Sequence, residues 1–146
     1  MKNLNLLSVI FCILLMTGFA SAQNVSVDGA KTVETTPAFT MLASHKLVVE
    51  SELQKLLTGY TAIHPDVLKK QSELEAIERE MTQMSITSEA KLSRLTTAYG
   101  RLLIRKFTEE ANLRHLLGRF TRQHPEVIEA TKKLKMTENK LSEKLQ

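Results

Sequence analysis

The chain has no tryptophan, one cysteine, three prolines and five glycines in 146 residues, and aromatic side chains make up 5% of it. Its only cysteine is Cys12, close to the N-terminus. A chain processed beyond that point has no thiol, so it forms no disulfide and must be held together by packing alone. With so few aromatics, a compact globular core of ordinary thickness is hard to build.

The sequence also lacks the signatures of catalysis. It has no Gly-x-Ser-x-Gly turn, no glycine-rich loop for phosphates and no pair of carboxylates in an apolar setting. A processed chain without cysteine offers no thiol nucleophile either. We therefore expect no enzymatic activity, no catalytic or cofactor-binding residue, and no metal site.

A strong excess of one charge is missing as well. Lysine and arginine number 20 against 16 acidic residues, a net charge of +4 that falls to +3 if Lys2 is removed. Both signs are interspersed, as where Lys69 and Lys70 are followed by Glu73 and Glu75, which is typical of solvated helix surfaces. Nucleic-acid binding needs a one-sided basic stripe, usually with aromatics, so we expect none. The nearest feature is a local patch for an acidic polymer, formed by Arg101, Arg105, Lys106, Arg114, Arg119 and Arg122.

The N-terminus has the pattern of a secretory signal peptide. Lys2 gives a positive start, an apolar run extends from Leu4 to Met16, and Ala20-Ser21-Ala22 presents the small residues that precede cleavage. This predicts a signal peptide over residues 1–22 and a periplasmic or secreted protein that begins at Gln23. The run is short for a membrane span, which needs about 20 apolar residues. An uncleaved anchor is the alternative, and only this segment would then contact the membrane.

Helical signals begin after a lead-in over residues 23–36, which is rich in small polar residues and predicted to be flexible. Thr36-Pro37 combines a hydroxyl cap with a proline suited to the first helical position. Apolar residues follow at a spacing of three and four, with Lys46 at the one position that breaks the series: Phe39, Leu42, Val49, Leu53, Leu56 and Tyr60. A second helix is predicted to begin at Pro65, so the chain reverses at residues 61–64 and forms an antiparallel hairpin.

The C-terminal half matches this hairpin at an offset of 60 residues, without a gap. Such agreement predicts an internal duplication. The second copy gives a third helix from about Ser88 to Arg119 and a fourth from Pro125 to near the end. Positions that recur identically include Lys46, Leu53, Leu56, Leu57, Val67, Leu74 and Glu78, which match Lys106, Leu113, Leu116, Leu117, Val127, Leu134 and Glu138.

The sequence thus predicts an all-α fold of four helices in two tandem, coiled-coil-like antiparallel hairpins. The predicted segments are the signal peptide 1–22, the lead-in 23–36, the first hairpin 37–84, a connector 85–88 and the second hairpin 89–146. Whether the hairpins pack together or extend end to end is left open by the sequence.

The two predicted corners share the pattern aromatic-Thr-x-x-His-Pro-acid. Histidines and acids at these points could bind a metal or act as acid-base pairs. Two ligands per corner are too few for a closed zinc site, so we favour a structural role in which histidine begins the helix and the acid neutralises exposed N–H groups. The residues are Tyr60, Thr61, His64, Pro65 and Asp66 in the first corner, and Phe120, Thr121, His124, Pro125 and Glu126 in the second.

The repeated corner, with Leu53, Leu56 and Leu57 before it and Val67 after it, resembles the coiled-coil segment of bacterial polysaccharide chain-length determinant and exopolysaccharide export proteins. The resemblance covers residues 46–81 and 106–141, and it implies periplasmic helical hairpins that oligomerise in an envelope assembly. A second membrane span, a membrane-proximal domain and a kinase segment have no counterpart in the sequence. Protein partners or self-association through the helical seams are therefore expected. The alternative is a periplasmic holdase chaperone of the Skp-like class, although residues 23–36 do not supply the strands through which those proteins form trimers.

Overall fold

The computed structural model describes residues 32–145, with side chains up to Lys144, and the predicted signal peptide lies outside this range. The described chain is all-α and contains no strand, which confirms the predicted fold class. A single 3-10 turn, η1 (Val33–Thr35), precedes the first long helix. The α-helices are α2 (Pro37–Gly59), α3 (Pro65–Ser85), α4 (Glu89–Leu92), α5 (Thr97–Leu117) and α6 (Pro125–Leu145).

Hydroxyl side chains begin two of the long helices. The Oγ1 atom of Thr36 accepts a hydrogen bond from the Phe39 N–H at 3.4 Å, and Pro37 fills the first helical position of α2. The Oγ1 atom of Thr96 accepts from the Tyr99 N–H at 3.3 Å in the same way and begins α5. Each bond satisfies one of the N–H groups that a helix N-terminus leaves without a partner.

The predicted third helix is not continuous. The short helix α4 and a turn over residues 93–96 precede α5, where we predicted one helix from about Ser88 to Arg119. The turn lets Leu92 and Leu95 reach the core, where both are buried. The Leu95 carbonyl also accepts a hydrogen bond from the Ala38 N–H at 3.1 Å, in the first turn of α2. Breaking the helix therefore satisfies a donor that would otherwise lack a partner.

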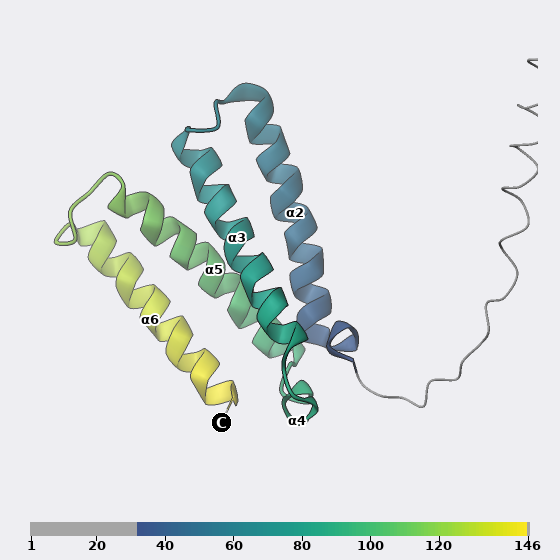
Figure 1. Ribbon diagram of the computed structural model, residues 1–146. Coiled ribbons are helices and arrows are strands. Elements are labelled where there is room, and N and C mark those ends of the chain that lie inside the picture. Colours follow the sequence, from purple (N-terminus) through teal and green to yellow (C-terminus); the bar gives the residue numbers. More distant parts are fainter. Residues whose placement is uncertain (1–31, 146) are drawn as a thin grey trace, which may run out of the picture. The chain divides into compact units, whose positions relative to one another are not determined.

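The two hairpins share one core. Helices α2 and α3 form the first hairpin, α5 packs against both of them, and α6 packs on α5 (Figure 1). The corner of the α2–α3 hairpin and the corner of the α5–α6 hairpin diverge from this shared region (Figure 1). The largest fully buried apolar side chains are Phe107, Leu42, Ile77, Val49 and Val67.

Helix α5 has two apolar stripes because it has neighbours on two sides. Tyr99, Leu103, Phe107 and Ala111 are spaced four apart and all buried. The sequence predicted one seam along this helix, through Leu92, Leu95, Tyr99, Leu102, Leu113, Leu116 and Phe120. That seam includes Tyr99 of the buried stripe but misses Phe107, and its members Leu113 and Leu116 are only half-buried. The contact between the hairpins therefore depends on a stripe that the predicted seam included only in part.

Gly100 lies where two helices approach closely, and we predict that a side chain at this position is costly. A Cβ atom at residue 100 would lie 3.0 Å from the Ala38 Cα and 3.3 Å from the Ala38 carbonyl oxygen. Gly100→Ala should gain about 1 kcal/mol in helix propensity. It should lose more than that, because the obstacle is backbone and overpacking costs about 1–3 kcal/mol.

Gly59→Ala is the matched control, because a Cβ atom there meets nothing within 4 Å. It should raise the free energy of unfolding by about 0.4–1 kcal/mol. Urea denaturation of both variants measures the difference. Equal stabilisation by the two substitutions would show that α2 and α5 are not in close contact at this point.

Candidate functional site

The first corner is closed by its own side chains. The Nδ1 atom of His64 accepts a hydrogen bond from the Asp66 N–H at 3.3 Å, and this makes His64 the N-cap of α3. The His64 ring stacks on Tyr60, with centroids 4.0 Å apart and an interplanar angle of 24°. The Thr61 carbonyl accepts from the His64 N–H at 3.0 Å, and Pro65 is the first helical residue.

The second corner repeats this geometry. The Nδ1 atom of His124 accepts from the Glu126 N–H at 3.4 Å, and the His124 ring stacks on Phe120 at 4.0 Å and 14°. The Thr121 carbonyl accepts from the His124 N–H at 3.1 Å, and Pro125 begins α6. Each histidine thus caps a helix and covers one face of an aromatic ring.

The capping geometry leads to a prediction for His64. An alanine would remove both the cap and the stacked ring, so His64→Ala should cost about 0.5–2 kcal/mol of stability. Asparagine also caps helices, so His64→Asn should cost only a few tenths of a kcal/mol. Thermal melts followed by circular dichroism compare the two. Equal losses for both variants would mean that the Nδ1 bond contributes nothing.

Two further features are absent from the described residues 32–145. In that range no group of three or more His, Cys, Asp or Glu side chains is arranged to hold a metal ion. None of the helices there is long and apolar enough to cross a membrane.

A buried glutamate joins the three core helices. The sequence interpretation placed Glu73 on a solvated surface, but its side chain is only 2% exposed. Its Oε1 atom accepts from Thr108 Oγ1 of α5 at 2.8 Å and contacts His45 Nε2 of α2 at 3.2 Å. Its Oε2 atom accepts from Lys70 Nζ at 3.0 Å, and Lys70 also pairs with Glu52 at 2.6 Å. The sequence prediction for Glu73 was wrong because a lysine and a glutamate three residues apart on a helix usually form an exposed ion pair.

The charge of Glu73 is stabilised by these partners. Burial on its own would raise the pKa of the Glu73 carboxyl. The hydrogen bonds from Lys70, Thr108 and His45 outweigh burial and hold that pKa below its ordinary value. Glu73 is therefore ionised, and it contacts a polar side chain on each of α2, α3 and α5. Such an arrangement links the three helices and indicates a structural role.

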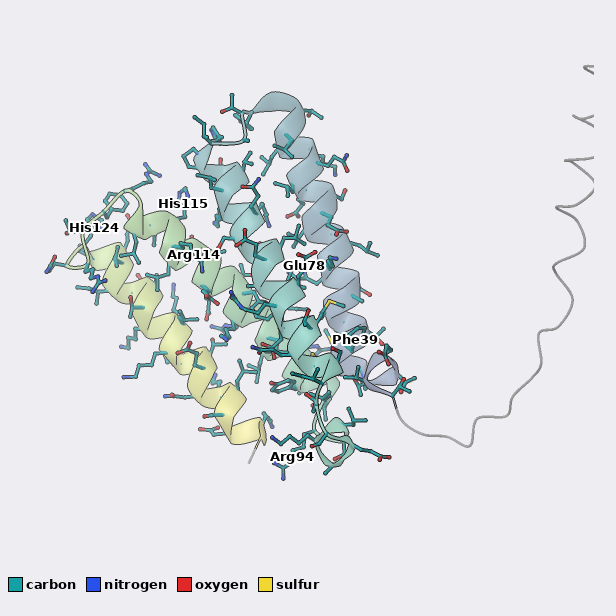
Figure 2. All side chains as sticks on the ribbon, viewed as in Figure 1. Phe39, Glu78, Arg94, Arg114, His115 and His124 are labelled. Carbon is teal, nitrogen blue, oxygen red and sulfur yellow. The ribbon has the colours of Figure 1, made fainter. Side chains whose placement is uncertain are left out.

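An open groove lies between the beginning of α3 and the end of α5, and it is the candidate binding site. Its volume is about 310 Å³. We call it the α3–α5 groove. Arg114 and His115 lie on the last turns of α5, near the corner (Figure 2). The groove is lined by Pro65, Leu68, Lys69, Ser72, Ala111, Arg114, His115, Gly118 and Arg119.

The groove forms where the buried stripe of α5 no longer contains large apolar residues. Phe107 fills the space between α5 and the first hairpin, but the next positions on that face are Ala111, Arg114 and Gly118. Small and charged side chains at these positions do not close the gap, so the helices separate toward the corners. Leu68, half of whose surface is exposed, supplies much of the apolar wall.

Polar contacts hold the cations at the rim of this groove. Arg114 donates from Nη1 to Ser72 Oγ at 2.5 Å, and its Nη2 atom lies 3.4 Å from Glu110 Oε1. Lys69 donates to Asn112 Oδ1 at 3.3 Å. The sequence singled out Arg114 and Arg119 as part of a basic patch, but it did not bring Lys69 to the same place.

Large apolar side chains are exposed around the first corner. The exposed fractions are 45% for Leu57, 50% for Tyr60, 80% for Ile63 and 50% for Leu68. We call these four residues the corner patch. At the second corner, Gln123 stands at the position that matches Ile63. The other three positions keep apolar counterparts in Leu117, Phe120 and Ile128, of which Leu117 and Ile128 are 42% and 56% exposed. The two corners therefore share a backbone geometry and differ mainly at the position of Ile63.

Comparison of the chain with protein-family models, with curated proteins and with solved structures gave no match.

Proposed function

We propose that this protein is an exported, non-catalytic helical interaction protein that contacts its partner through the corner patch. The observation that carries the proposal is the gathering of four exposed apolar side chains at one corner, with Ile63 the most exposed of them at 80%. Burying one such side chain is worth about 1.5–3 kcal/mol, and apolar surface gathered in one place commonly marks a contact site.

The fold supports this use of the corner. The corner patch lies away from the core shared by the two hairpins, so contact there does not require the fold to open (Figure 1). The capped and stacked corner fixes the backbone, so little conformational entropy is lost on binding. The setting we propose is an envelope assembly, with exopolysaccharide export as the process, because the corner pattern resembles that of export proteins.

A holdase chaperone is the second candidate, because exposed apolar side chains at the end of a hairpin also suit the binding of unfolded chains. The two candidates differ in their partners. An assembly component has one partner or a discrete oligomer, whereas a holdase binds many unfolded polypeptides with little sequence preference.

The test compares the wild-type chain with Ile63→Glu and with the matched variant Gln123→Glu. Light scattering over a concentration series measures self-association, and pull-down from envelope extracts measures partner capture. We expect a discrete oligomer or complex that Ile63→Glu abolishes and Gln123→Glu preserves. Capture of many unfolded chains would favour the holdase, and a stable monomer that captures nothing would refute both candidates.

A further inference from the structure

We propose that the α3–α5 groove binds an acidic peptide segment that carries an apolar side chain. This inference rests on the proposed function, because it names the chemistry of a partner protein. It concerns a surface separate from most of the corner patch, with Leu68 belonging to both.

The charge of the groove sets it apart from the matching positions in the other half of the chain. Lys69, Arg114, His115 and Arg119 are the basic residues of its lining, and Glu110 forms an ion pair with Arg114 at its rim. At the offset of 60 residues the counterparts are Glu129, Gln54, Lys55 and Gly59. Three of the four counterparts carry no positive charge, so the repeated pattern does not account for this cluster.

Two of the cations are preorganised. Ser72 fixes the Arg114 guanidinium and Asn112 fixes the Lys69 ammonium through the bonds described above. Each of these two partners is neutral, so neither bond cancels a charge. Arg114 also pairs with Glu110 at 3.4 Å, which offsets part of its charge, but Lys69, Arg114 and Arg119 together leave the groove with a net positive charge. Arginine presents a planar fork of donors that suits a carboxylate, and holding it in place lowers the entropy lost on binding. The groove is therefore complementary to carboxylate groups.

The size and the walls of the groove select among acidic ligands. A volume of about 310 Å³ lies at the lower end of the range of roughly 300–1,000 Å³ for ligand pockets, enough for one or two large side chains. Pro65 and Leu68 offer exposed aliphatic surface, which suits Leu or Phe of a peptide. An anionic polysaccharide or nucleic acid would find no Phe, Tyr or Trp ring to stack on among the lining residues. An acidic peptide with an apolar anchor is the better fit.

The probe for the test is a fluorescein-labelled peptide of repeating Asp-Leu-Glu-Phe, titrated into the full-length purified protein and followed by anisotropy. Two comparison peptides carry Lys in place of the acids, or Ser in place of Leu and Phe. Saturable binding of the first peptide alone is expected, weakening several-fold as salt shortens the Debye length from about 10 Å at 0.1 M to about 3 Å at 1 M. Amide resonances of Ala111 and Gly118 should shift on binding.

The variants Lys69→Glu and Arg114→Gln introduce the residue that stands at the matching position of the other half of the chain. Each variant should weaken peptide binding about tenfold or more. Arg101→Gln and Lys132→Glu make the same charge changes on exposed residues that do not line the groove, and they should bind as the wild type does. Circular dichroism confirms that each variant is folded.

Three results would overturn the inference: no binding of the acidic peptide, equal binding of the Ser peptide, or wild-type affinity in both groove variants. The proposed function fails separately. If Arg114→Gln still captures the partner and Ile63→Glu does not, the corner patch is the contact site and the groove is not. If neither substitution alters capture, both proposals fail.

Discussion

Replacing Phe107 with alanine is expected to lower the free energy of unfolding by about 3–5 kcal/mol. The side chain is 2% exposed and fills the space between α5 and the first hairpin. Its removal leaves a cavity that helices packed on both sides of α5 cannot easily close. Such a loss is a large part of the roughly 5–15 kcal/mol that holds a typical domain together. Urea denaturation at low temperature measures it.

Leu47→Ala is the matched control for this prediction. Leu47 stands at the position that matches Phe107 at the offset of 60 residues, but it is 67% exposed. Its truncation should change stability by less than about 0.5 kcal/mol. Two small effects of similar size would mean that α5 does not join the hairpins into one core.

Replacing Glu73 with alanine is expected to cost about 3 kcal/mol. The substitution leaves Lys70, Thr108 and His45 without their shared acceptor. Lys70 and His45 are 25% and 22% exposed, so water can recover part of the loss. This places the effect at the lower end of the range for breaking a buried pair.

Glu129→Ala is the control, because Glu129 also pairs with a lysine, Lys133 at 2.7 Å, but its side chain is 66% exposed. Its loss should change stability by less than about 0.5 kcal/mol. Thermal melts of both variants under one buffer condition provide the comparison. A loss as small for Glu73→Ala as for Glu129→Ala would show that the buried cluster does not hold the three helices together.

The depressed pKa of Glu73 also predicts how stability depends on pH. In the unfolded chain this carboxyl takes up a proton around its ordinary pKa of 4.5, whereas in the folded protein it does so only at lower pH. Its contribution is therefore complete above pH 4.5 and is lost as the pH falls through the folded pKa. Below pH 4.5 the melting temperature of Glu73→Gln should fall less steeply than that of the wild type. Parallel curves would contradict the assignment.

The helix starts could be predicted from sequence because they depend on local chemistry. Thr36, His64 and the prolines that begin α2, α3 and α6 act within one turn of their own position. The break before α5 could not be predicted, since it serves the Ala38 N–H of another helix. Local signals carry no information about a partner that is far away in the sequence.

Burial was harder to predict than helix formation. Helix α5 has apolar residues on two faces. The spacing of apolar residues along the sequence does not show which face the first hairpin covers, so it does not predict the burial of Phe107. Glu73 has nothing beside it in the sequence to mark a buried charge. The groove was predicted only in part, because Arg114 and Arg119 lie on one helix whereas Lys69 reaches them through tertiary packing.

Site-specific photo-cross-linking in cells shows whether the corner patch contacts the partner. A photoreactive amino acid replaces Ile63 in one strain and Gln123 in another, and the cross-linked products are identified by mass spectrometry. Both positions are exposed and follow the same corner geometry. We predict that position 63 gives a discrete cross-linked protein and that position 123 gives little or none. Equal products from both positions, or no product from position 63, would contradict the account.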